Sequence, residues 1–139
     1  MCNHNGQEGV RSIAEILGVI NILQQNASKS ESGLDTCDRG FLGCGTSSLN
    51  CNTRPVMLYL CNGIPLCMPT TKDNVEMQSM SNVFRVEKIE EGSCTFRVLA
   101  ESHEHGCEYP YVATNSFFTI NLNCVCVLRC LSDTHVDCI

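Results

Sequence analysis

The stretch NVFRVEKIEEGSCTFRVL, residues 82–99, holds the clearest indication of how this chain folds. Residues 83–89 and 94–99 are two short runs rich in β-branched and aromatic side chains, with Glu-Glu-Gly-Ser between them. This pattern predicts a β-hairpin. Because side chains alternate between the two faces of a strand, Cys94 falls on the same side as Phe96, and we expect it to point inward.

A second hairpin signal precedes the first along the chain. Residues 56–61 form an apolar, β-prone run, and Asn62-Gly63 directly after them is a strong turn signal that leads toward residues 64–67. Pro65 should keep that second arm short or at an edge, because proline cannot donate a hydrogen bond to a neighbouring strand.

The C-terminal part of the chain has the longest strand pattern. From Phe118 to Cys130 every second residue is apolar or a cysteine, and the residues between them are polar as far as Asn123. This alternation predicts one long strand over 118–130. Residues 111–113 are expected to begin another, separate short strand.

The N-terminal part has helical periodicity instead. From 10 to 25, apolar residues recur at steps of three and four, the pattern of an amphipathic helix. Two interpretations remain open for it: a helix packed on its own domain, or a docking element for a neighbouring subunit.

These elements give the expected fold and its divisions. We expect a mainly β protein, an antiparallel β-sandwich preceded by one N-terminal amphipathic helix. Residues 1–26 form the helical segment, 27–51 a cysteine-bearing loop or linker, and 52–139 the β-domain, all within a single compact domain.

Cysteine content is the outstanding feature of the composition. The chain has 12 cysteines in 139 residues, a density typical of a disulfide scaffold or a thiolate metal site. A chain of this length can bury enough apolar surface to fold without disulfides, so the excess of thiols indicates cross-linking or metal binding. The net charge is −6 and the arginines are scattered, which argues against a nucleic-acid partner.

The cysteines conflict with the rest of the sequence. The N-terminus lacks the pattern of a signal peptide, and no segment approaches the ~20 apolar residues of a membrane span. We therefore expect synthesis in a reducing cytoplasm, no membrane partner, and thiols that bind metal, stay reduced or oxidise late, after assembly or release.

The positions of the cysteines restrict their pairing. Cys124 and Cys126 are about 6.6–6.8 Å apart along a strand, at or beyond the limit for a disulfide, so each needs another partner unless both are free thiols in a core. Cys2, Cys107 and Cys138 are expected to be the most exposed and to favour bonds between molecules. The alternative is that several of these cysteines close internal loops. The candidate disulfide or cross-linking residues are Cys2, Cys37, Cys44, Cys51, Cys94, Cys107, Cys124, Cys126, Cys130 and Cys138.

Metal binding is the alternative function. His103, His105 and Cys107 are suitable zinc ligands, and Cys124 and Cys126 would add soft donors. No C-x-x-C pair is present, so the sequence predicts no metal site and no cofactor. Motifs of catalytic nucleophiles and phosphate-binding loops are missing too, and we do not expect an enzyme.

Three segments carry a resemblance to a known family: NTRPVMLYLCNGIPLCMP at 52–69, the hairpin at 82–99, and FFTINLNCVCVLRCLSD at 117–133. Together they resemble the CotY/CotZ/ExsY family of cysteine-rich spore coat and exosporium proteins of endospore-forming bacteria. By motif, the matched cysteines are Cys94, Cys124, Cys126 and Cys130. The chain departs from the family pattern in a short segment before the final strand and in crowded cysteines from Cys37 to Cys67.

The resemblance implies a function as well as a location. It implies a structural protein that self-assembles into a disulfide-cross-linked, two-dimensional hexagonal lattice in the spore coat or exosporium. The partners would be copies of itself, as hexamers, and other spore coat or exosporium proteins. Synthesis in the mother cell without a signal peptide, followed by late oxidation, would remove the redox conflict. A cysteine/histidine zinc-binding module remains the alternative.

Overall fold

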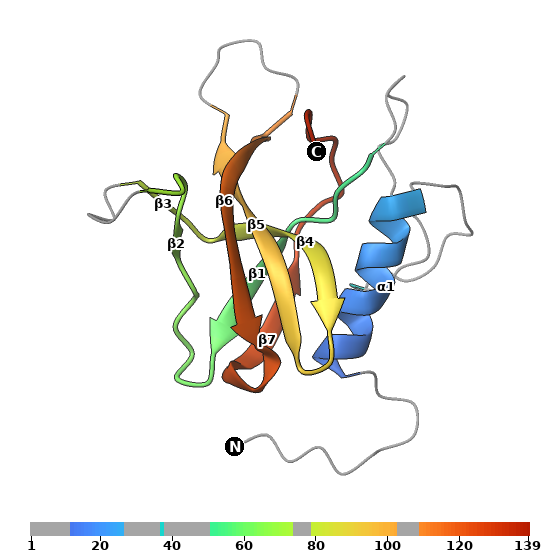
Figure 1. Cartoon of the computed structure of the whole chain (residues 1–139), viewed down its shortest axis with the longest axis vertical. Helices are drawn as coiled ribbons and strands as arrows, with labels where there is room; N and C mark the ends of the chain where they lie inside the picture. The colour runs from blue at the N-terminus through green and yellow to red at the C-terminus, as the bar shows by residue number, and fades with distance from the viewer. Residues whose placement is uncertain (1–11, 27–36, 38–50, 74–78, 103–108) are drawn as a thin grey trace.

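The structure is a computed structural model, which describes residues 12–26, 37, 51–73, 79–102 and 109–139. Within these residues one α-helix lies against a mainly antiparallel β structure (Figure 1). The strands form a five-stranded sheet and a two-stranded sheet. The predicted fold class, mainly β with one helix at the N-terminal side, is confirmed.

Helix α1 (Ile13–Asn26) starts where the sequence supplies a cap. The Ser12 hydroxyl accepts a hydrogen bond from the Glu15 backbone N–H at 3.2 Å, which satisfies a donor that the first turn leaves free. Leu17 and Ile20 are fully buried in the core. The helix therefore packs on its own domain, the first of the two interpretations of its amphipathic pattern.

The large sheet has the strand order β6-β5-β4-β1-β7, and all its pairings are antiparallel. The two short strands β2 and β3 pair with each other beside it. The strands are β1 (Val56–Leu60), β2 (Met68–Pro69), β3 (Met80–Ser81), β4 (Val83–Glu90), β5 (Ser93–Glu101), β6 (Tyr111–Asn121) and β7 (Val125–Cys130).

Both predicted hairpins are confirmed. Strands β4 and β5 pair up to Glu90 and Ser93, and Gly92 in the turn has φ +76°, a value that glycine adopts without strain. After β1, Gly63 has φ +83° and the returning arm makes only one bridge, between Tyr59 and Pro65. The short second arm agrees with the limit expected from that proline.

The predicted single strand over 118–130 is wrong. A 3₁₀ turn, η1 (Leu122–Cys124), interrupts it, and the part before the turn is continuous with residues 111–113 as β6. The Asn121 side chain accepts a hydrogen bond from the Asn123 backbone N–H at 3.0 Å, a local bond that competes with extended pairing. Alternating side chains alone did not reveal this break.

The turn η1 also determines the shape of the sheet. It joins β6 to β7, which are the two outermost strands of the five. In a flat sheet these strands would lie about 19 Å apart, because four strand spacings of ~4.8 Å separate them. The connection from Asn121 to Val125 covers four residue steps, which span only about 8 Å at the 3₁₀ rise of ~2 Å per residue. The sheet must therefore curl, and Figure 1 shows β6 crossing in front of β1 and β7.

The core lies inside this curl. Phe84, Phe96 and Phe118 come from β4, β5 and β6, and their ring centroids are 4.8–6.2 Å apart. Tilted, edge-to-face and offset aromatic pairs at such distances add to the energy of area burial. Cys94 joins this cluster and is 1% exposed, so the prediction that it points inward is confirmed.

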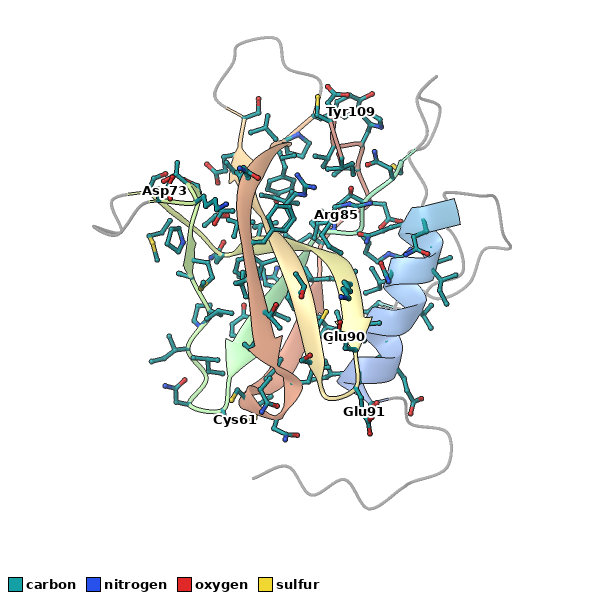
Figure 2. The ribbon with its side chains drawn as sticks, viewed as in Figure 1. Cys61, Asp73, Arg85, Glu90, Glu91 and Tyr109 are labelled. Carbon is teal, nitrogen blue, oxygen red and sulfur yellow. A yellow bond between two sulfur atoms is a disulfide. The ribbon has the colours of Figure 1, made fainter. Side chains whose placement is uncertain are left out.

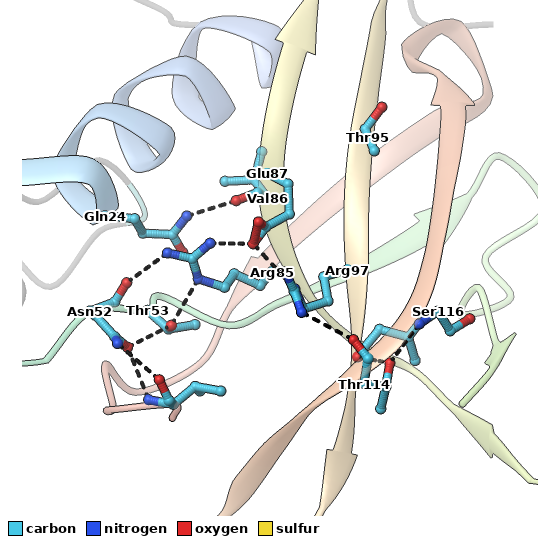
Figure 3. Close-up of polar contacts among 12 residues, drawn as sticks. Gln24, Asn52, Thr53, Arg85, Val86, Glu87, Thr95, Arg97, Thr114 and Ser116 are labelled. Carbon is cyan, nitrogen blue, oxygen red and sulfur yellow. Dashed lines mark hydrogen bonds and ion pairs between the residues drawn. The ribbon is translucent and has the colours of Figure 1, made fainter. Parts of the chain in front are cut away.

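Helix α1 is attached to the sheet by a buried side-chain amide (Figure 3). Strands β1 and β4 share one pair, Val56 with Phe84, and the same register would place Arg54 opposite Val86. Gln24 from the helix lies between them instead. Its amide oxygen accepts from the Arg54 N–H at 3.0 Å, and its nitrogen donates to the Val86 carbonyl at 2.9 Å. The helix thus completes the hydrogen bonding where the two strands separate.

Arg85 makes a second connection across this gap. Its guanidinium donates to the Thr53 hydroxyl at 3.0 Å and to the Asn52 carbonyl at 3.2 Å, and it pairs with Glu87. Figure 3 shows these contacts beside Gln24. Polar side chains therefore replace the backbone ladder between β4 and the segment that enters β1.

We predict that Gln24→Ala lowers the free energy of unfolding by about 2 kcal/mol or more, because it leaves the Arg54 N–H and the Val86 carbonyl buried without their partner. Urea denaturation of the monomeric protein measures the effect. Gln25→Ala is the matched control, since Gln25 is the next helical residue and is exposed. Equal losses in the two variants would contradict the bridging role of Gln24.

Candidate functional site

The described cysteines divide into bonded and free ones. Cys37 is bonded to Cys130 and Cys61 to Cys126, with Cα–Cα distances of 5.4 and 4.9 Å. Cys51 is also disulfide-bonded. The four free cysteines among the described residues are Cys67, Cys94, Cys124 and Cys138.

The Cys37–Cys130 bond lies beside a buried ion pair. The Arg54 guanidinium binds both carboxylate oxygens of Asp133, at 2.8 and 3.1 Å, and donates to the Cys37 carbonyl at 2.8 Å. The two side chains are 2% and 1% exposed. This arginine therefore holds the residue that carries the disulfide and the segment after β7, and both contacts stabilise the bonded arrangement.

The Cys61–Cys126 bond lies at the other end of the β1–β7 pairing. The register pairs Leu60 with Val125, so the residue after β1 is brought next to β7. Cys61 is exposed and Cys126 is half-buried. Figure 2 shows Cys61 at the end of the sheet where η1 turns. The bond fixes the end of β1 to the edge strand.

The free cysteines occupy two different environments. Cys67, Cys124 and Cys138 are exposed, whereas Cys94 is buried. Burial raises the pKa of the Cys94 thiol to about 12, because a thiolate there would lose its hydration. Of the four free cysteines that the structure describes, the three exposed ones are available as nucleophiles to other molecules, since the thiolate is the reactive form.

The structure places the candidate cysteines as follows. Cys37, Cys126 and Cys130 form bonds within the chain, so for them the internal closure of loops is what the structure shows. Cys124 and Cys126 do not bond each other, as expected, and neither is a buried core thiol. Cys2, Cys44 and Cys107 lie outside the described residues.

Two cysteines were missed as candidates from sequence. Cys61 was overlooked because its partner lies 65 residues away, on a strand whose pairing with β1 has no local signal. Cys67 is the last residue of the second hairpin arm expected from the sequence and is exposed. The sequence signal that could have indicated its exposure was its place shortly after the Asn62-Gly63 turn, between Pro65 and Pro69.

The described part of the chain contains no group of three or more His, Cys, Asp or Glu residues placed to hold a metal. Of the ligands considered for zinc, Cys126 is consumed by its disulfide. His103, His105 and Cys107 lie outside the described residues. Among the described residues no helix has the length and apolarity needed to cross a membrane.

Comparison with known proteins identifies the family. The family model described as spore coat protein Z matches residues 1–111. The chain belongs to this family. The match includes the segments at 52–69 and 82–99 that carried the resemblance, whereas the segment at 117–133 lies beyond it. No curated protein and no solved structure matches the chain.

Membership of this family supports a structural role in the spore coat. The disulfides and exposed thiols agree with such a role, because a protein layer needs covalent stability more than it needs a cleft. The spore coat part of the resemblance is confirmed. The family favours a structural protein over an enzyme.

We predict that Arg54→Met destabilises the fold by about 3–5 kcal/mol, because it removes the guanidinium partner of the buried Asp133 carboxylate. Thermal or urea unfolding under oxidising conditions measures the loss. The double variant Arg54→Met/Asp133→Leu should recover much of it, since no buried charge is left. A double variant as unstable as the single one would contradict this account.

We predict that Cys94 resists alkylation in the folded protein from pH 7 to pH 9. Its pKa of about 12 lies above that range, so the thiol stays protonated there, and burial also excludes the reagent. Iodoacetamide labelling followed by peptide mass spectrometry measures this. Cys124 is the exposed control and should label readily, while Cys94 should label only after unfolding. Labelling of both at the same rate in the native state would refute the prediction.

Proposed function

We propose that this chain is a structural subunit that self-assembles into a disulfide-cross-linked, two-dimensional lattice in the outer layers of the bacterial spore, the coat or the exosporium. Family membership supports the spore coat role. The lattice and its cross-linking are inferred from the arrangement of cysteines on the folded domain and from the resemblance of the sequence to the wider family.

The observation that carries the proposal is the surplus of exposed thiols. The domain is already closed by internal disulfides, yet Cys67, Cys124 and Cys138 remain free on its surface. Thiols that do not serve the fold and are accessible from outside are suited to bonds between molecules. A domain of this size does not need them for stability.

The thiols are also distributed in a way that suits a lattice. Cys61 and the turn that carries Cys124 lie at one end of the sheet, and the C-terminus, one residue beyond Cys138, lies at the opposite end (Figures 1 and 2). A subunit with reactive groups at both ends can bond to more than one neighbour. An extended assembly requires at least two bonding sites on each subunit. If the subunits had only one, and it paired with the same patch on a second copy, they would form a closed dimer.

The proposal includes partners and timing. The partners are copies of the chain, arranged as hexamers, and other proteins of the coat or exosporium. Synthesis takes place in the mother cell, where thiols stay reduced, and the bonds between subunits form after assembly. Nucleic acid and membranes have no part in it. For the zinc-binding alternative, no observation on the described residues adds support.

We predict that protein expressed in a reducing cytoplasm forms ordered sheets visible by electron microscopy. After oxidation the sheets should survive boiling without reductant and fall apart when boiled with it, because only the disulfides hold subunits whose folds have melted. Soluble monomers throughout, with only monomer on non-reducing gels, would overturn the proposal. Elemental analysis of the reduced protein tests the alternative, since stoichiometric zinc would favour a metal-binding module.

A further inference from the structure

Three cysteines gather at the end of the sheet where η1 turns. The Cys61–Cys126 disulfide links the end of β1 to β7, and the free thiol of Cys124 lies two residues before Cys126. The Sγ atom of Cys61 is 4.0 Å from the Cys124 carbonyl oxygen, so the disulfide packs directly against the turn that carries the thiol. A nucleophile and a disulfide electrophile therefore share one surface.

The two cysteines of the disulfide are not equally exposed. Cys61 is exposed, whereas Cys126 is half-buried on the edge strand. An attacking thiolate must approach along the line of the sulfur–sulfur bond, so the accessible sulfur is the one attacked. Here the more exposed cysteine is Cys61, which makes its sulfur the target of attack and Cys126 the leaving group.

We propose that this surface is a thiol–disulfide exchange site through which two copies of the chain become covalently linked. Cys124 of one copy attacks Cys61 of the other. The inference deepens the proposed function, on which it rests, by naming the bond and the way it forms. It goes further in one respect, because the exchange needs no added oxidant.

The step is balanced in atoms and electrons. The Cys124 thiolate forms a new bond to the Sγ of Cys61 in the second copy, and the Cys61–Cys126 bond of that copy breaks. Cys126 leaves as a thiolate and takes up the proton that Cys124 gave to solvent. One disulfide is lost and one is gained, so the number of disulfides is unchanged.

The site is suited to reciprocal exchange. Because each copy carries both Cys124 and the Cys61–Cys126 bond on the same surface, a two-fold contact brings each thiol to the disulfide of the partner. An exposed apolar side chain adjoins this surface in the chain, because Ile64, three residues after Cys61, is 57% exposed. Its burial would favour the contact before any bond forms.

The test uses full-length protein in which the Cys61–Cys126 bond has been verified by mass spectrometry. Equal amounts of ¹⁴N- and ¹⁵N-labelled protein are mixed without oxygen or oxidant and analysed on non-reducing gels. We expect a dimer whose cross-linked peptides join Cys61 and Cys124 in mixed isotope pairs, which proves that the bond runs between chains. Blocking free thiols with iodoacetamide beforehand should abolish it.

Variants separate the roles of the residues. Cys124→Ser should lose the oxidant-free dimer, while Cys138→Ser, which removes an exposed thiol at the other end of the molecule, should keep it. The double variant Cys61→Ser/Cys126→Ser should lose the oxidant-free dimer and still dimerise through Cys124 when diamide is added, which shows that its thiol remains accessible.

Two results would overturn the exchange site. One is a wild-type protein that cross-links only when an oxidant is supplied, and the other is a Cys124→Ser variant that dimerises as the wild type does. Neither result contradicts the proposed lattice. A protein that forms neither ordered sheets nor cross-links even with oxidant would instead remove the proposed function itself.

Discussion

The short connection between the two edge strands is the constraint on which the rest of the structure depends. Because η1 joins β6 to β7 across the full width of the sheet, the sheet curls and encloses the aromatic cluster of Phe84, Phe96 and Phe118. Within the curled sheet, β4 and β1 share a single residue pair. Gln24 and Arg85 then supply the hydrogen bonds that the strands no longer exchange.

Local features of this fold could be predicted from the sequence, and non-local ones could not. The β4–β5 hairpin and the Asn62-Gly63 turn were recognisable because their signals lie within a few neighbouring residues. The pairing of β1 with β7 joins segments 65 or more residues apart, and no local pattern encodes it. The break at η1 was missed because Leu122 and Cys124 continue the alternation, although Asn121 and Asn123 carried the turn signal.

The same distinction applies to the cysteines. The inward orientation of Cys94 followed from alternation along one strand. The partners of Cys37 and Cys61 depend on which strands become neighbours, so only the structure could assign them. Among the described residues one free cysteine is buried and three are exposed, and burial rather than spacing separates inert thiols from reactive ones.

The order of the strands in the chain has a consequence for biosynthesis. Both internal disulfides between described residues join an early segment to β7, with sequence separations of 93 and 65 residues. The first bond cannot form until the ribosome has translated Cys130, and the second cannot form until it has translated Cys126. A nascent chain therefore carries the cysteines of these two bonds unpaired with each other for most of its synthesis, and a reducing compartment would protect them from premature pairing during that time.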